Sequence, residues 1–255
     1  MAATTIRDNT AIGEPDILSV APAADPNSAT PNANTSVAVN LGAYATTGDG
    51  RVFRFAYDGG TALVPGTLYQ TVATDDVNAH DLTCASVAVG DTNVSVTSTA
   101  STLAANALAG GFLTFTGAGG GQTYAISGNT AAAASAFTIT LFDPIRTALT
   151  TPAADCVFNP YNGVVKQPTT ATSAVAGAAI IATAGTQYAW LQTRGPIALQ
   201  NDNASTIAVG APVSASTTTA GAVTAYLDGT SPALIGYALE AIEGTQWGLV
   251  QLTIE

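Results

Sequence analysis

Short runs of alternating apolar and polar residues recur along the chain from about residue 51 onward. Clear examples are residues 51–57, 111–116 and 136–141, and residues 87–97 form two such runs around the turn at Gly90 and Asp91. A period of two, with Gly, Asn or Asp between the runs, is typical of half-buried antiparallel strands. The pattern therefore predicts an all-β protein, rich in the Thr, Val, Tyr and Phe residues that suit a pleated surface.

The second half of the chain continues in the same style, and no repeat of fixed period is visible, which disfavours a solenoid or a propeller. Two stretches have the composition of a helix. Residues 98–108 are expected to form one short helix, whereas residues 130–136 lie between strands and are expected to be a loop. Further strands are expected over residues 178–183, 188–193, 195–200, 222–227, 234–239 and 249–254.

Residues 1–42 differ from the rest and predict an extended N-terminal arm. Prolines recur in its first 35 residues, and proline lacks an amide donor and disfavours helix before it. Such an arm gains little by folding alone, so it is expected to lie on a partner; the alternative interpretation is a disordered terminus. Its apolar residues, which are the expected contacts, are Ile6, Ile12, Ile17, Leu18 and Val20.

A break rich in Pro and Asn over residues 152–168 is the predicted domain boundary. It divides the chain after the arm into a first β domain, residues 43–158, and a second β domain, residues 159–255. Each is expected to be a small antiparallel β-sandwich or β-barrel of the jelly-roll or β-tulip kind.

The composition then narrows the range of possible functions. Hydrophobic residues make up 47% of the 255 residues and charged residues only 9%, so the chain is expected to fold with a largely uncharged surface. The formal net charge is −11 with six Lys and Arg residues, which argues against binding to nucleic acid or to anionic membranes. Neither an apolar run of membrane-spanning length nor a secretory signal is recognised, so synthesis in the cytosol is expected. Cys84 and Cys156 are accordingly expected to be buried thiols.

The chain offers few groups for catalysis, and no cofactor or metal is expected. Its one histidine, His80, lies beside Asp81 and near Asp75 and Asp76. A metal site in this stretch is the alternative to a solvated acidic loop. There is no G-x-S-x-G nucleophile motif, and the glycine run at residues 117–121 lacks the Gly-Lys-Ser/Thr of a phosphate loop.

Two tryptophans and one pair of carboxylates are the remaining candidates for a site. Glu240 and Glu243 lie three residues apart beside Trp247, which suits the paired carboxylates of a glycosidase, but a solvent-facing turn explains them as well. Trp190 and Trp247 lie in alternating strands, so they are expected in the core or at a subunit interface, with stacking on sugars as the alternative. The residues therefore favour a protein that is not an enzyme.

Six segments carry a recognisable pattern through their order along residues 85–255. They are residues 88–97, 108–115, 119–126, 139–145, 185–195 and 235–239. Together they resemble structural proteins encoded beside the major capsid gene of tailed bacteriophages. The resemblance transfers no catalytic residues. It implies a virion role, often that of a trimeric cement protein on capsid symmetry axes, or else that of a minor head or tail protein.

The expected function is that of a capsid decoration protein on the capsid exterior. Its expected partners are the major capsid protein and further copies of itself, with which it is expected to form a homotrimer. A surface of small uncharged side chains suits this role because it loses little side-chain entropy when buried. Trp190 and Trp247 are expected contacts beside the arm. The alternatives are a receptor- or glycan-binding, fibre-like virion protein, and a cellular β-rich adhesin or glycan-active enzyme.

Overall fold

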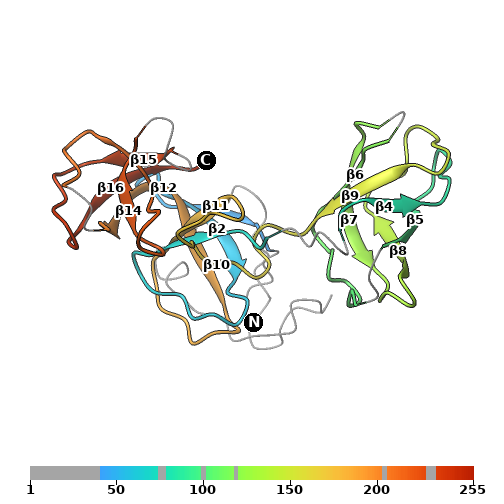
Figure 1. The fold of residues 1–255 in the computed structure, drawn as a ribbon, viewed down its shortest axis with the longest axis horizontal. Coiled ribbons are helices and arrows are strands. Elements are labelled where there is room, and N and C mark those ends of the chain that lie inside the picture. The colour runs from blue at the N-terminus through green and yellow to red at the C-terminus, as the bar shows by residue number, and fades with distance from the viewer. Residues whose placement is uncertain (1–40, 74–78, 99–101, 118–119, 203–205, 228–233) are drawn as a thin grey trace. The chain divides into compact units, whose positions relative to one another are not determined.

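Every regular element in the described part of the chain is a β-strand (Figure 1). The computed structural model describes residues 41–73, 79–98, 102–117, 120–202, 206–227 and 234–255. The predicted all-β class is confirmed. Residues 1–40 of the proposed N-terminal arm, with Ile6, Ile12, Ile17, Leu18 and Val20, lie outside the described residues.

The described residues form two compact units. We call residues 73–160 the barrel unit. We call residues 41–72 together with residues 161–255 the sheet unit. Each is described by itself below.

The barrel unit is a closed six-stranded antiparallel barrel in the order β4-β5-β8-β7-β6-β9. Its strands alternate between buried and exposed side chains, and the buried set, which includes Val94, Phe115 and Ile139, fills the interior. The apolar positions of the alternating sequence pattern therefore face the inside of the barrel, and the polar positions face the outside. The strands are β4 (Leu82–Cys84), β5 (Asn93–Thr97), β6 (Phe112–Phe115), β7 (Thr123–Asn129), β8 (Ala136–Leu141) and β9 (Ala153–Val157).

The sheet unit is built on one ten-stranded antiparallel sheet. Its main path runs β10-β3-β11-β12-β16-β15-β13-β14, while β2 pairs with both β12 and β1. The strands are β1 (Tyr44–Thr46), β2 (Val52–Tyr57), β3 (Leu68–Gln70), β10 (Val165–Lys166), β11 (Val175–Ala179), β12 (Tyr188–Gln200), β13 (Pro212–Ala215), β14 (Val223–Ala225), β15 (Leu234–Ala238) and β16 (Trp247–Thr253).

Strand pairing divides the chain differently from the two consecutive domains expected from the sequence. β2 pairs with β12, and β3 pairs with β10 and β11, so residues 41–72 belong with the C-terminal part of the chain. The barrel unit is therefore an insertion between β3 and β10, with its second junction between Pro160 and Tyr161. Composition marks the end of the insertion by a stretch rich in Pro and Asn, whereas no such stretch marks its start near residue 73.

The helix expected over residues 98–108 is wrong for residues 102–108, the part of that stretch that the structure describes beyond Ser98. Residues 105–110 form turns, and Leu103 and Leu108 point into the barrel core. The buried side chain of Asn129 holds this segment, since its Oδ1 accepts from the backbone N of Leu108 at 2.9 Å and its Nδ2 donates to the carbonyl of Ala104 at 3.0 Å. Those bonds satisfy backbone groups that a helix would have paired internally. The loop expected over residues 130–136 is confirmed up to Ser135, since β8 begins at Ala136.

Candidate functional site

The two tryptophans named from the sequence occupy opposite environments. Trp190 in β12 is 3% exposed and packs with Phe53 and Ala45, whereas Trp247 at the start of β16 is 50% exposed. Of the two, Trp247 therefore presents its ring on the surface.

Trp247 belongs to an apolar surface on the outer side of β12, β16 and β15. Register fixes this side: Ala198 lies opposite Leu249, Tyr237 lies opposite Gln251, and the intervening residues, such as Val250 and Leu252, face the core. The backbone N of Leu239 donates to the carbonyl of Leu249 at 2.8 Å, which continues the β15–β16 register. We call this surface the neutral face; its residues are Pro196, Ala198, Tyr237, Leu239, Trp247 and Leu249.

The indole of Trp247 rests directly on the backbone of Gly66. A Cβ added at Gly66 would lie 2.2 Å from Cζ3 of Trp247 and 2.8 Å from the carbonyl oxygen of Ala198. Gly66 also has a φ of +70°, which favours glycine. The ring thus lies against a position that favours glycine, and half of the Trp247 surface remains exposed.

The carboxylates near Trp247 are both exposed. Oε1 of Glu240 accepts a hydrogen bond from the backbone N of Leu249 at 2.8 Å. The Glu240 side chain therefore folds back on β16 and extends the hydrogen bonding of the neutral face.

A second apolar surface crosses the wall of the barrel unit. Phe112 in β6 lies opposite Val157 in β9 and Ala125 in β7, and the backbone N of Phe142 donates to the carbonyl of Ala125 at 3.0 Å. We call these four residues the barrel row. Phe112, Val157 and Phe142 are 46%, 51% and 67% exposed, while their sequence neighbours Leu113, Cys156 and Leu141 are buried. The row is therefore a continuous outward-facing apolar stripe.

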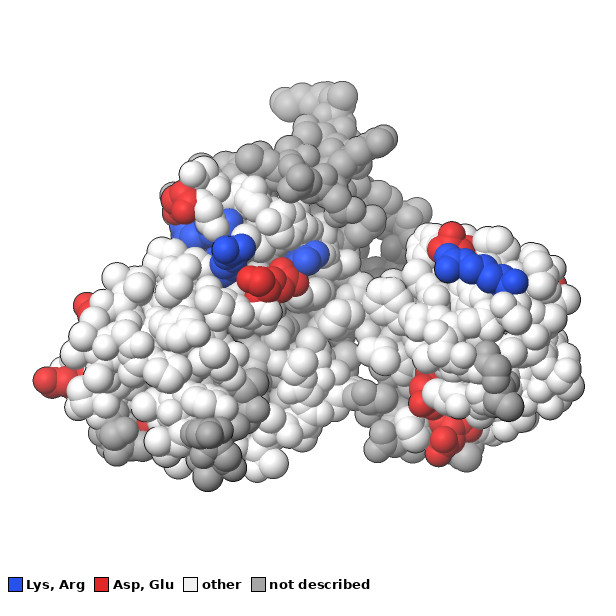
Figure 2. Space-filling view, turned by 90° about the horizontal axis from the view of Figure 1, so that it is seen from above, with Lys and Arg blue, Asp and Glu red and all other residues white. Residues whose placement is uncertain are grey.

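Charged side chains are sparse among the described residues and gather in small groups. In Figure 2 blue and red atoms form a few clusters, with broad uncharged areas around them. One cluster joins Arg54 to Glu255: Nε of Arg54 lies 2.9 Å from both carboxylate oxygens, and Nη1 donates to the carbonyl of Gly42. Tyr161 and Thr193 also donate to Glu255. One of the six basic side chains is thus paired with a carboxylate inside the sheet unit.

The structure brings a third ionisable side chain to the acidic stretch around His80. Asp155 of β9 lies next to it: Nε2 of His80 is 3.7 Å from Asp155 Oδ2, and Nδ1 is 3.3 Å from Asp81 Oδ2. Asp155 Oδ1 also accepts from the backbone N of Asp81 at 2.8 Å. One imidazole and two carboxylates are ligands suited to a divalent cation, and the same geometry makes an ion-paired triad when the imidazole is protonated. Of the sequence candidates, Asp75 and Asp76 lie outside the described residues.

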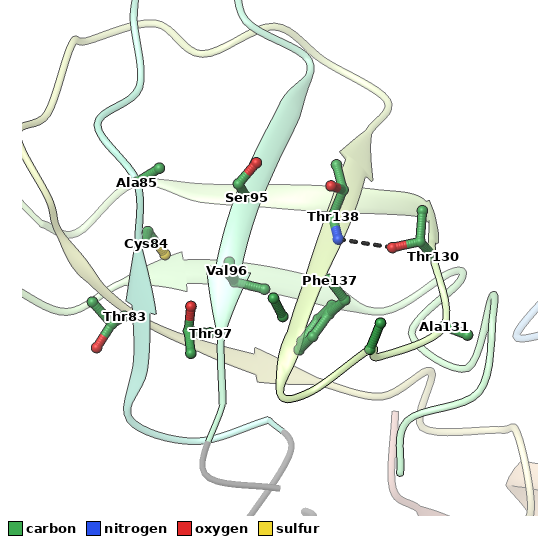
Figure 3. Close-up of a pocket in the computed structure, with 12 residues that line it drawn as sticks. Thr83, Cys84, Ala85, Ser95, Val96, Thr97, Thr130, Ala131, Phe137 and Thr138 are labelled. Atoms are coloured by element: carbon green, nitrogen blue, oxygen red, sulfur yellow. Dashed lines mark hydrogen bonds between the residues drawn. The ribbon is translucent and has the colours of Figure 1, made fainter. Parts of the chain in front are cut away.

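A shallow hollow of about 510 Å³ lies on the barrel wall over β4, β5 and β8 (Figure 3). Small hydroxyl and methyl groups line most of it, and the backbone N of Thr138 donates to Oγ1 of Thr130 at 2.9 Å. Cys84 is the one ionisable residue in this lining, and burial raises its pKa to about 11. A thiol with that pKa is protonated at neutral pH and is a poor nucleophile. Cys84 and Cys156 are both buried free thiols, as expected.

Comparison with protein-family models, with curated proteins and with solved structures finds no match. Within the described ranges, no helix has the length and apolar character needed to cross a membrane.

Proposed function

We propose that this chain is a structural protein of a tailed-bacteriophage virion, which decorates the capsid and stabilises it by binding the lattice of the major capsid protein. The observation that carries the proposal is the neutral face. It combines four large, half-exposed side chains at neighbouring positions of β15 and β16, in a chain of which only 9% of the residues are charged. The resemblance of residues 85–255 to head-associated phage proteins supplies the identity of the partner.

The energetics favour attachment of many copies over one tight contact. Tyr237, Leu239, Trp247 and Leu249 are 43–50% exposed, so covering them contributes about 1 kcal/mol each. That total of about 4 kcal/mol only reaches the lower end of the roughly 4–15 kcal/mol that association costs in lost freedom. Repeating the contact around a closed homotrimer, and along a lattice, adds the missing affinity through avidity.

Two measurements test the proposal. The first is the copy number of the chain in purified particles, which should be comparable to that of the major capsid protein rather than a few per virion. The second is binding of the purified chain to heads stripped of it. Leu249→Glu should weaken binding about tenfold or more, because it places a charge in a dry contact. Val89→Glu, at a 67% exposed turn of the barrel unit, is the matched control and should bind normally. Normal binding by Leu249→Glu, or a copy number of a few, would contradict the proposal.

The second candidate function is recognition of a glycan by a fibre-like virion protein. The half-exposed indole of Trp247, which lies against Gly66, favours it, because an exposed aromatic ring can stack on a sugar. A glycan array separates the two candidates: binding that is lost in Trp247→Ala would support this second function. Trp190→Ala is no test of it, since Trp190 is buried.

A further inference from the structure

Three ionisable side chains meet where the first and last strands of the barrel unit lie side by side. His80 and Asp81 come just before β4, and Asp155 lies in β9, which pairs with β4. One ligand atom from each of the three lies within 4.8 Å of the other two. The cluster therefore joins residues that are 74 positions apart in the sequence, near the two ends of the barrel unit.

Hydrogen bonds hold the backbone of the two segments together at this cluster. The backbone N of Cys156 donates to the carbonyl of Ala79, which is fully buried. The backbone N of Asp81 donates to Oδ1 of Asp155 at 2.8 Å, while Oδ2 of the same carboxylate lies 3.7 Å from Nε2 of His80. One oxygen of Asp155 is thus fixed by the backbone and the other is turned towards the imidazole, which is how metal-binding carboxylates are commonly oriented.

The negative charge of the cluster exceeds its positive charge. In the part of the chain that the structure describes, the ion pairs of Asp81 and Asp155 are both with His80. Two carboxylates therefore share one imidazole, which can carry a single positive charge at most. A divalent cation would balance both carboxylates and would bind the imidazole in its neutral form.

We propose that His80, Asp81 and Asp155 form a Zn²⁺ site that links the start of the barrel unit to its end. Zn²⁺ binds imidazole nitrogen and carboxylate oxygen at about 2.0–2.2 Å, so ligand atoms around one ion lie about 3–3.5 Å apart. The carboxylates now flank different ring nitrogens, so one of them has to move by about 1–2 Å to share the ion. The side chain of Asp81, which is 85% exposed, has the room for this movement.

The ligand set also selects the class of metal. Imidazole nitrogen suits Zn²⁺ and related transition metals, whereas Ca²⁺ takes about six to eight oxygen ligands. His80 is 49% exposed, so water can reach the ion and complete its coordination. An ion that binds both segments in the folded state stabilises the barrel unit. The proposal is independent of any role in a virion.

Calorimetric titration of the full chain with Zn²⁺ at neutral pH tests the site, and we expect a single ion per chain. His80→Gln and Asp155→Asn should each weaken binding about tenfold or more, because even the loss of a residue that orients a ligand weakens metal affinity by about 10–100-fold. Asp155→Asn keeps an oxygen that can accept from the backbone N of Asp81. Asp143→Asn removes a different exposed carboxylate of the barrel unit, so it is the matched control and should bind normally. Far-UV circular dichroism checks that each variant is folded.

Hydrogen exchange followed by mass spectrometry reports on the two linked segments in the unmodified chain. Zn²⁺ should slow exchange of the backbone amides of Asp81 and Cys156, which donate the hydrogen bonds across the cluster. The same addition should leave their exchange in His80→Gln unchanged.

Three results would overturn the proposal. The first is the absence of saturable binding up to about 1 mM Zn²⁺, which would leave the cluster as an ion-paired triad only. The second is unchanged affinity in His80→Gln, which would place the ion on other carboxylates. The third is binding of Ca²⁺ as tight as that of Zn²⁺, because attraction to exposed acidic groups alone would then explain it.

Discussion

Replacing Gly66 with alanine should destabilise the sheet unit by about 2–4 kcal/mol and dislodge Trp247. Two unfavourable free-energy contributions of similar size, one from the backbone and one from steric contact, add up to this loss of stability. The φ of +70° at Gly66 places any other residue in the left-handed region, which costs about 1–2 kcal/mol. The new methyl group would lie 2.2 Å from Trp247 and 2.8 Å from the carbonyl oxygen of Ala198, so the ring must tilt away, at about 1–2 kcal/mol in lost packing and local strain.

Gly210→Ala separates the two terms. Gly210 has a similar φ of +75°, but nothing lies within 4 Å of a Cβ added there, so this variant should show the backbone term alone. Urea unfolding followed by tryptophan emission is the appropriate assay, because Trp190 and Trp247 both lie in the sheet unit and report on it specifically. The emission of folded Gly66→Ala should also shift to the red. If Gly66→Ala is no less stable than Gly210→Ala, the contact between Gly66 and Trp247 does not hold the ring.

Three further predictions concern stability and titration. Glu255→Gln should lower the free energy of unfolding by about 1 kcal/mol, because the Arg54–Glu255 pair is only partly exposed. Glu243→Gln is the control and should leave the free energy of unfolding unchanged in the same urea titration. Equal effects of the two substitutions would contradict a stabilising role of the pair. Cys84 and Cys156 should not react with a thiol reagent in the folded chain at pH 8, because burial raises the pKa of each thiol. Both should react in denaturant. A fast reaction of the folded chain would refute this prediction. Burial and the nearby Glu255 carboxylate raise the pKa of Tyr161 from 10.0 to about 12, so the folded state holds this proton more tightly than the unfolded state. Its contribution to stability is then complete below pH 10 and lost as the pH rises towards 12, and Tyr161→Phe should remove that part of the pH dependence of unfolding.

The sequence predicted which segments form strands better than it predicted which strands pair with one another. In β5 and β8 each apolar position of the alternating pattern is a buried position of the barrel, because one face of each strand meets the core and the other meets solvent. The pairing of Tyr57 with Tyr188 joins residues far apart in the chain, and nothing local specifies it. The same holds for the insertion of the barrel unit, which depends on that pairing.

The candidate surfaces were predictable only in part. Trp190 and Trp247 both lie in alternating runs, and the sequence could not rank their exposure, because β12 is covered on both faces at Trp190 and β16 on one face at Trp247. Asp155 was missed, since only the β4–β9 pairing brings it to His80. Gly66 carried no signal beyond that of a turn residue, because its importance comes from a ring that is distant in sequence.

The distribution of charge determines how the two apolar surfaces, the neutral face and the barrel row, can meet a partner. A net charge of −11 with only six basic residues makes free copies repel one another at long range. That repulsion acts over about 8–10 Å at physiological salt, whereas the contacts offered by the neutral face and the barrel row act only when surfaces touch. Repulsion at a distance and apolar contact at close range together favour attachment where a partner surface matches the shape around half-exposed Trp247 and Phe112. Selection by shape over many weak contacts suits a repeating lattice better than a single small ligand, and this is the physical argument for the role in assembly that we propose.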